Sequence, residues 1–417
     1  MRFYGYRCSL CGGEYGESEE LYLCPKDQGC LDIVLDAEWI RRSVNPAQLI
    51  GPDRETSHWR YLPLLPLDDP GAEGTPLRAV GWTPLYALPA LRARHGLKAF
   101  WLKDESANPT ASFKDRASSL VVAHALQIGA ETVVTASTGN AGAALAGMAA
   151  ALQLQAVVFA PGGAPRAKLA QMSAYGAEVV LVEGNYDQAT ALSLEVSREL
   201  GWYCRNTGYN PFTAEGKKTA AFEIWEAVRG GSIALSEGAP LSIFVSVGDG
   251  NIISGIHKGF RDLEDLGWLE FRPRIFGVQA EGSAAVARAF QAGTERIEAV
   301  RAATVADSIC VDMPADGLRA LRAARQTGGA YITVKDQQIL NAVAELGRVG
   351  VFAEPAAAAA FAGYLKALET RQIGKEDPVL VLSTGSGLKD IAALQRIVPN
   401  APVIEPTVGA VKRLLKL

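Results

Sequence analysis

The chain has 417 residues, of which 48% are hydrophobic and 21% are charged. This composition supports a large buried core, predicts about two globular domains and excludes an intrinsically disordered chain. The net charge is −4 without a basic cluster, and no uncharged apolar run reaches the length of a bilayer span. We therefore predict no nucleic-acid partner and no membrane partner. No signal-peptide core precedes the first cysteines, so we expect a cytoplasmic protein.

Residues 1–36 form a turn-rich, cysteine-rich segment that resembles a zinc ribbon. Its candidate metal ligands are Cys8, Cys11, Cys24 and Cys30. A second Cys-x2-Cys pair would need a cysteine at position 27, where Asp27 stands, so an oxygen ligand from Asp27 is an alternative to Cys30. A degenerate ribbon that folds without metal is the third interpretation. Structural zinc is thus a candidate cofactor.

Residues 37–80 are rich in proline and aspartate, which predicts an extended arm or linker. Beyond them, short strands that are apolar on both faces alternate with helical segments. This alternation predicts an α/β fold class with two doubly wound, mostly parallel sheets covered by helices on both sides. The expected strands are residues 99–102, 132–135, 156–159, 178–182, 243–247, 275–278 and 379–382.

One lysine is a candidate for a catalytic role. Lys114 follows the proline-punctuated turn Asn108-Pro109-Thr110 and opens an apolar helical run. Farther along, the strand at residues 132–135 leads into Ser137-Thr138-Gly139-Asn140 at the start of another helix. A lysine amine can form a Schiff base, and N–H groups at a helix N-terminus can hold a carboxylate. The pairing indicates amino-acid chemistry on pyridoxal phosphate, whereas Lys114 alone also fits a surface lysine on a helix.

Two more turns follow strands. Gly248, Asp249, Gly250, Asn251 and Ile252 lie between a strand and a helix, so their N–H groups form a candidate nest for a cofactor phosphate. Thr384, in a later glycine-rich turn, offers a hydroxyl for a pyridine nitrogen. Each turn alone also fits an ordinary connection. Neither matches a dinucleotide fingerprint or a P-loop, and no Ser-His-Asp set stands in a recognisable order.

Taken together, these segments resemble the threonine synthase branch of the fold type II pyridoxal-phosphate enzymes. The resemblance runs from Trp82 to Asp390, which is most of the chain. Its most specific parts are residues 102–105, 108–116 and 137–140, and its supporting parts are residues 215–219, 352–356 and 384–390.

The resemblance implies a role for each of these positions. Lys114 would be the catalytic Schiff-base lysine, which also shuttles protons between substrate carbons. Asn140 would bond the phenolic oxygen of pyridoxal phosphate, residues 248–252 would hold its phosphate, and Thr384 would face its pyridine nitrogen. A hydroxyl at that nitrogen favours elimination and replacement over transamination. Residues 137–139 would bind the carboxylate of a small amino-acid substrate.

For the chain as a whole, the resemblance implies a homodimeric lyase that converts O-phosphohomoserine and water to threonine and phosphate. The large cofactor domain would comprise residues 81–117 and 207–417. A small mobile domain, residues 118–206, would close over the substrate and exclude water.

One segment departs from the family pattern. The family carries an Asn-Ser pair and an arginine for the substrate phosphate, where this chain has Thr207-Gly208 and Thr213. We predict Thr207, Thr213 and Lys217 as substrate-binding residues, with Lys218 or Arg205 as further candidates to compensate for the missing arginine. The departure leaves two alternatives. One is a paralogue that catalyses β-elimination or β-replacement on serine, threonine or phosphoserine, and the other is a catalytically silent regulatory module.

Overall fold

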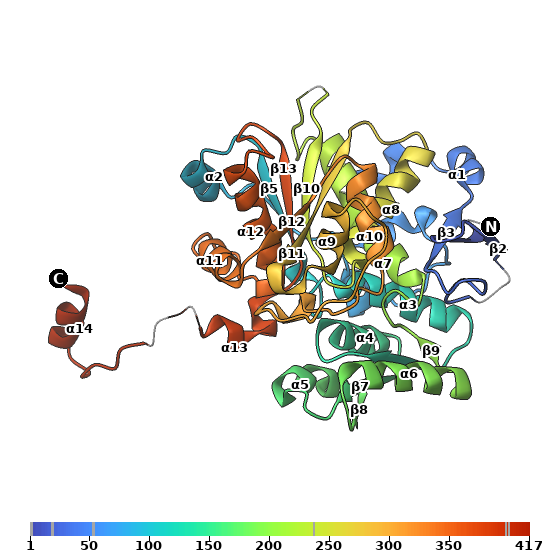
Figure 1. The fold of residues 1–417 in the computed structure, drawn as a ribbon, viewed down its shortest axis with the longest axis horizontal. Helices are drawn as coiled ribbons and strands as arrows, with labels where there is room; N and C mark the ends of the chain where they lie inside the picture. Colours follow the sequence, from blue (N-terminus) through green and yellow to red (C-terminus); the bar gives the residue numbers. More distant parts are fainter. Residues whose placement is uncertain (1–2, 18–20, 52–54, 237, 397, 399–400) are drawn as a thin grey trace.

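The computed structural model describes residues 3–17, 21–51, 55–236, 238–396, 398 and 401–417. Its strands form three sheets of six, four and three strands. The six-stranded sheet lies inside the larger body, with the four-stranded sheet below it and the three-stranded sheet on the side of the N-terminus (Figure 1). The predicted α/β class with mostly parallel sheets is confirmed.

The six-stranded sheet has the order β12-β11-β10-β13-β5-β4, and all its pairs are parallel except β4 with β5. Its strands are β4 (Leu85–Tyr86), β5 (Phe100–Asp104), β10 (Leu241–Ser246), β11 (Pro273–Ala280), β12 (Tyr331–Val334) and β13 (Val379–Ser383).

Both faces of this sheet are buried under helices. Successive side chains of each strand point to opposite faces, so each strand contributes to both cores. On β10, Ile243 and Val245 pack into one core with α7, α8, α9 and α10, whereas Phe244 packs into the other with α2, α11 and α12. This explains why the strands are apolar at every position. The helices are α2 (Pro89–His95), α7 (Phe212–Arg229), α8 (Asn251–Asp265), α9 (Ala285–Gln291), α10 (Gly317–Gln326), α11 (Asp336–Gly347) and α12 (Pro355–Glu369).

The four-stranded sheet is entirely parallel and has the order β8-β7-β6-β9. Its core on one face includes α3 and α4, and its core on the other face includes α6. The elements are α3 (Lys114–Gln127), β6 (Thr132–Ala136), α4 (Asn140–Ala151), β7 (Gln155–Pro161), α5 (Arg166–Ala174), β8 (Glu178–Val182), α6 (Tyr186–Leu200) and β9 (Tyr203–Cys204).

The N-terminal sheet is antiparallel, with the order β2-β1-β3. It comprises β1 (Phe3–Cys8), β2 (Glu14–Gly16) and β3 (Leu31–Leu35). The following segment differs from the predicted extended arm, because it contains α1 (Ala37–Ser43) and the 3-10 helix His58–Leu64. Trp59, Tyr61 and Leu64 of that helix are fully buried, so the segment is part of the body.

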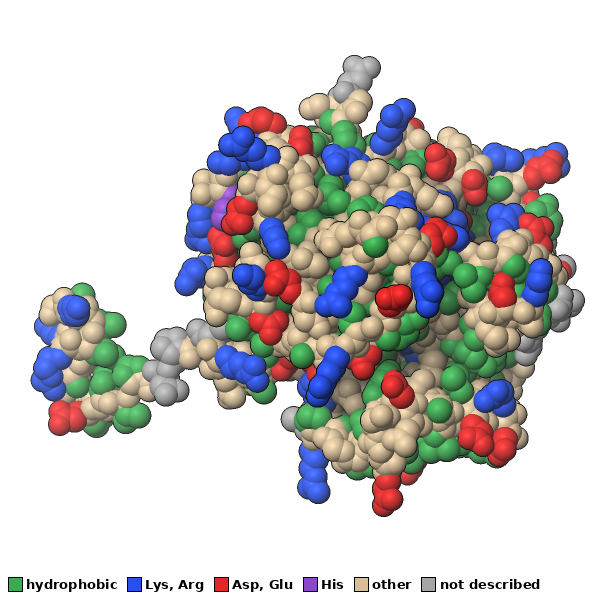
Figure 2. All heavy atoms as spheres, viewed as in Figure 1, with side chains coloured by type: hydrophobic (Ala, Val, Ile, Leu, Met, Phe, Trp, Pro, Cys, Tyr) green, Lys and Arg blue, Asp and Glu red, His purple; other side chains and the backbone are tan. Residues whose placement is uncertain are grey.

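The chain ends in α13 (Ile391–Leu394) and α14 (Val408–Leu415), and α14 stands apart from the body in Figure 1. On the face shown in Figure 2, lysine and arginine side chains are interspersed with aspartate and glutamate. Within the described part of the chain, every helix is too short or too polar to cross a membrane.

Candidate active site

Lys114 is the first residue of α3 and lies beyond the carboxyl end of β5. The turn before it is fixed to the segment that follows β13, the strand beside β5. The N–H of Phe113 donates to the carbonyl of Thr384 at 2.9 Å, and the N–H of Ser386 donates to the carbonyl of Ala111 at 3.1 Å. Two backbone hydrogen bonds therefore hold the lysine turn and the Thr384 turn together.

The surroundings of Lys114 favour its neutral form. Burial is the main cause that lowers the pKa of its amine, and the positive charge of Arg205 lowers it further. Asp249 and Glu354 act in the opposite direction. A lysine amine reacts as a nucleophile only when neutral, so this environment suits Schiff-base chemistry.

The Gly248–Ile252 segment forms a cradle between β10 and the N-terminus of α8. Gly250 has a positive φ of 92°, and a Cβ on Gly248 would lie 2.9 Å from the Cα of Ile309, so neither position accommodates a side chain readily. The backbone N–H groups of a helix N-terminus attract anions. Lys217 lies beside this segment, because its Nζ donates to Oδ1 of Asn251 at 2.6 Å.

Most of the predicted site residues meet in two adjoining pockets. The first is lined by residues that include Lys114, Asn140, Gly248, Asp249, Gly250, Asn251, Ile252, Glu354 and Thr384. The second is lined by residues that include Lys114, Ser137, Thr138, Gly139, Asn140, Arg205 and Thr207. Lys114 and Asn140 belong to both, so they stand at the junction between a compartment that ends in the anion cradle and one that ends at α4.

Two residues predicted to bind substrate lie elsewhere. Thr213 is fully buried in the first turn of α7, and its hydroxyl donates to the carbonyl of Asn210 at 2.7 Å. It lines neither of the two pockets. Lys217 lies one turn farther along α7, at the anion cradle and not on the substrate side. Lys218 points to Asp262, with its Nζ donating to Oδ2 at 2.8 Å.

Arg205 is the cation that the structure does place in the second pocket. Its side chain is fully buried, its Nη1 donates to Oγ1 of Thr207 at 2.7 Å, and its Nε donates to Oγ of Ser118 at 3.2 Å. Its Nη2 has no hydrogen-bond partner, and no described carboxylate forms an ion pair with it. Burial lowers the pKa of this guanidinium to about 10.

Glu354 also lines the first pocket, although no role was predicted for it. The Nδ2 of Asn140 donates to its two carboxylate oxygens at 3.0 and 3.2 Å. Burial raises the pKa of the Glu354 carboxyl to about 7, and the hydrogen bond from Asn140 opposes this rise. The resemblance includes residues 352–356, but a single sequence carries no signal that assigns a function to this carboxylate.

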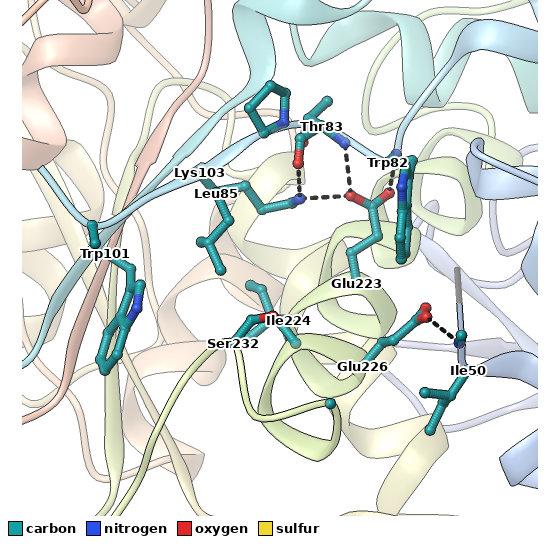
Figure 3. A pocket seen from close by; sticks show the side chains of 15 residues that line it. Ile50, Trp82, Thr83, Leu85, Trp101, Lys103, Glu223, Ile224, Glu226 and Ser232 are labelled. Atoms are coloured by element: carbon teal, nitrogen blue, oxygen red, sulfur yellow. Dashed lines mark hydrogen bonds and ion pairs between the residues drawn. The ribbon is translucent and has the colours of Figure 1, made fainter. Parts of the chain in front are cut away.

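Arg116, in the first turn of α3, ties this helix to two neighbouring segments. It is fully buried, and its guanidinium pairs with Glu105, from Nε to Oε2 at 2.7 Å, and with Glu223, from Nη2 to Oε2 at 2.9 Å. Lys103 also reaches Glu223, at 2.6 Å. Figure 3 shows the part of this network that lines a separate cavity, where Lys103 lies between Glu223 and the carbonyl of Thr83. Because these charges are paired with one another, we interpret the network as structural support for Lys114.

The N-terminal cysteines form a cluster outside the two pockets. The side-chain ligand atoms of Cys8, Cys11, Cys24 and Asp27 all lie within 4.8 Å of one another. Cys30, the fourth predicted cysteine ligand, is directed elsewhere, because its Sγ donates to the carbonyl of Gly208 at 3.1 Å. Of the two ligand sets left open by the sequence, the structure assembles the one with Asp27.

The first pocket fits pyridoxal phosphate by the chemistry of its donors. It combines a lysine amine with a lowered pKa, a cradle in which Gly248 and Gly250 carry no side chain, and the neutral hydroxyl of Thr384. The family model described as "Pyridoxal-phosphate dependent enzyme" matches residues 77–385. The chain is also 35% identical over 415 residues to the threonine synthase of Methanosarcina acetivorans, covering 99% of this chain and 98% of that protein.

The chain belongs to the threonine synthase family of pyridoxal-phosphate-dependent enzymes. A second member, the threonine synthase of Methanocaldococcus jannaschii, is 36% identical over 413 residues, covering 98% of this chain and 99% of that protein. It follows that the chain is a pyridoxal-phosphate-dependent lyase.

Solved structures share the fold at lower identity. Threonine deaminase isoform 2 from Solanum lycopersicum superposes with a TM-score of 0.63 at 23% identity, covering 76% of this chain and 87% of that chain. Diaminopropionate ammonia lyase from Escherichia coli superposes with a TM-score of 0.64 at 19% identity, covering 87% of this chain and 91% of that chain.

Proposed function

We propose that this threonine synthase family member converts O-phosphohomoserine and water to threonine and phosphate. The relatives named threonine synthase support this reaction because they match almost the whole chain. The observation that carries the proposal is Arg205, a buried guanidinium with a free Nη2 in the pocket beside Lys114. A buried cation without a carboxylate partner is costly unless an anion completes it. The phosphate of the substrate is that anion.

Arg205, together with Thr207, would bind the substrate phosphate in place of the arginine that is missing at position 213. The hydrogen bond from Nη1 of Arg205 to Oγ1 of Thr207 orients the guanidinium and leaves Nη2 for the ligand. A guanidinium holds phosphate oxygens through directed, charge-assisted hydrogen bonds, which a threonine hydroxyl at position 213 cannot replace. The lost family arginine is therefore replaced in space by an arginine at a different position in the sequence.

The other residues divide the remaining tasks. Lys114 binds the cofactor, and its Nζ accepts a proton from one substrate carbon and returns it to a neighbouring one. Asn140 would bond the phenolic oxygen of the cofactor, the Gly248–Ile252 cradle with Lys217 would hold its phosphate, and Thr384 would bond its pyridine nitrogen. When bound, pyridoxal phosphate supplies the electron sink for the charge that develops on these carbons.

The substrate carboxylate is assigned to Ser137, Thr138 and Gly139. These residues directly precede α4 and line the second pocket, and the N-terminus of a helix favours an anion. The substrate then lies between two anion-binding sites, the α4 N-terminus for its carboxylate and Arg205 for its phosphate. Residues 118–206 are the part proposed to close over it and exclude water, in a homodimer.

One assay tests the proposal. The purified enzyme is supplied with O-phosphohomoserine, and phosphate and threonine are measured together. We expect equal amounts of both products, and none from the Lys114→Ala variant. If no phosphate forms while serine or threonine yields ammonia, the enzyme is a β-eliminating paralogue and the proposal is wrong. A protein that shows no visible absorption band with added pyridoxal phosphate would support the silent regulatory module instead.

A further inference from the structure

Three thiols and one carboxylate converge at the base of the N-terminal sheet. Cys8 ends β1, Cys11 lies in the turn to β2, and Cys24 and Asp27 lie in the turn before β3. All four ligand atoms lie within 4.8 Å of one another, and the sulfurs of Cys11 and Cys24 are 3.8 Å apart. This separation is what two sulfurs on one tetrahedral metal ion require, because a Zn–S bond is about 2.3 Å long.

The backbone is shaped to stabilise anionic ligands. The N–H of Leu10 donates to the sulfur of Cys8 at 3.3 Å, and the N–H of Gly13 donates to the sulfur of Cys11 at 3.4 Å. The N–H of Gly29 likewise donates to Oδ1 of Asp27 at 2.9 Å. The adjoining cleft is lined by Arg261, Arg319 and Asp32 as well as Cys8 and Cys11. Both arginines pair with Asp32, so the backbone N–H groups are the donors that directly stabilise the anionic ligands.

We propose that Cys8, Cys11, Cys24 and Asp27 bind one zinc ion, and that this ion fixes the N-terminal segment as a brace against the active site. Sulfur-rich tetrahedral sites select zinc over the hard cations magnesium and calcium, and an aspartate oxygen completes the four-coordinate set. A closed site of four protein ligands leaves no position for substrate, so the role of the metal is structural. The inference does not depend on which amino acid the enzyme uses.

The brace reaches the loop that follows β9. Tyr22, two residues before Cys24, accepts a hydrogen bond on its hydroxyl from the N–H of Cys204 at 2.9 Å. Its ring stacks on Tyr209 with centroids 4.5 Å apart. On the other side of the same turn, Cys30 donates to the carbonyl of Gly208. The loop held in this way, residues 204–209, carries Arg205 and Thr207.

A second path leads from the N-terminal sheet to the phosphate cradle. Asp32 in β3 accepts a hydrogen bond from Nη1 of Arg319 at 2.7 Å. Arg319 also pairs with Asp316, from Nε to Oδ1 at 2.6 Å, and Oδ2 of Asp316 accepts from Nδ2 of Asn251 at 2.7 Å. Asn251 is the cradle residue that Lys217 contacts. The metal site is therefore connected to both ends of the active site by direct hydrogen bonds, ion pairs and a ring contact.

The metal is tested first, by elemental analysis of the full-length protein purified without added metal. We expect one zinc per chain, with binding weakened about 10-fold or more in Cys24→Ser and Asp27→Asn, since loss of groups around a metal costs this much or more. Cys30→Ser and Cys310→Ser are the matched controls and should keep their zinc. Zinc-free protein that takes up none from an equimolar solution overturns the proposal. So does bound iron, a Cys11–Cys24 disulfide found by mass spectrometry, or zinc lost only in Cys30→Ser.

The brace is tested by the affinity for pyridoxal phosphate, measured from its absorption band. Removing the zinc with a chelator should raise the dissociation constant about 5-fold or more, the scale of a coupling between two sites, and restoring zinc should reverse the change. Asp32→Asn should raise it as well while the zinc content stays at one per chain. An unchanged dissociation constant in the zinc-free protein would overturn the brace, even where the metal site itself is confirmed.

Discussion

The Nζ of Lys217 donates to Oδ1 of Asn251 at 2.6 Å, inside the protein and at the N-terminus of α8. Burial, followed by the charges of Lys114 and Arg205, lowers the pKa of Lys217 well below its usual value. Such a lysine gains its full charge only when an anion arrives beside it. The pair is therefore consistent with the proposed role of the cradle in binding the cofactor phosphate.

Replacement of Lys217 by methionine should therefore weaken cofactor binding. A charge-assisted hydrogen bond contributes about 1.5–3 kcal/mol, which corresponds to about 10- to 100-fold in the dissociation constant of pyridoxal phosphate. The measurement is an absorption titration of the apoenzyme. Lys218→Met is the control, because Lys218 pairs with Asp262 away from the cradle and should lower thermal stability without changing this constant. Equal losses of cofactor affinity in both variants would contradict the assignment.

Arg205→Gln and Thr213→Val should separate substrate binding from folding. Loss of the guanidinium should raise the KM for O-phosphohomoserine about 10- to 100-fold, since it removes a charge-assisted contact to the phosphate. Thr213→Val should leave KM nearly unchanged, because the Thr213 hydroxyl bonds Asn210 and does not line the pocket. Steady-state kinetics on both variants gives the comparison. A larger rise in KM for Thr213→Val than for Arg205→Gln would reverse the proposed roles.

Glu354 should give the enzyme a pH dependence near neutrality. Its pKa is raised to about 7, so the carboxyl loses its proton as the pH rises through this value and becomes a better acceptor for Asn140. We expect kcat/KM to increase across this range, because it reports the free enzyme, and we expect the inflection to be absent in Glu354→Gln. An inflection that persists in that variant belongs to another group.

His58 should make the folded state sensitive to acid. Burial and then the charge of Arg116 lower its pKa to about 3, so it stays neutral in the folded chain where an unfolded histidine takes up a proton. Stability should therefore fall as the pH decreases from about 6.5 toward 3, by about 1.4 kcal/mol per pH unit from this group. Urea unfolding of the native protein and His58→Gln at several pH values measures the difference in slope. Parallel slopes would assign the acid sensitivity to other residues.

Most strands of both large sheets were predictable because each is a short apolar run bounded by turns. Three strands were missed: Leu85–Tyr86, Tyr203–Cys204 and Tyr331–Val334. The first two are only two residues long, and Thr333 interrupts the apolar pattern of the third. The 3-10 helix His58–Leu64 was mistaken for an extended arm because Pro63 lies inside it. Its burial depends on contacts with residues far along the chain, which no local pattern contains.

In the site, the positions at strand ends were predictable because parallel strands bring their carboxyl ends to one edge. Two features were not predictable: the Thr213 side chain is buried away from the pocket, and Nη2 of Arg205 has no partner. Both depend on how α7 and β9 are placed in the folded chain. The direction of the Cys30 side chain could not be predicted from the sequence either. Its spacing fits a ribbon, but the turn at Gly29 directs its sulfur to Gly208 and brings Asp27 to the other thiols.

The hydrogen bond between Phe113 and Thr384 also has a consequence for synthesis of the chain. Lys114 is synthesised well before β13, the strand that leads into the Thr384 turn. Until then the turn lacks a partner for its backbone groups and an ordered neighbour on the open edge of β5. A chain that terminates before β13 therefore carries the amine of Lys114 without the turn that holds it in place.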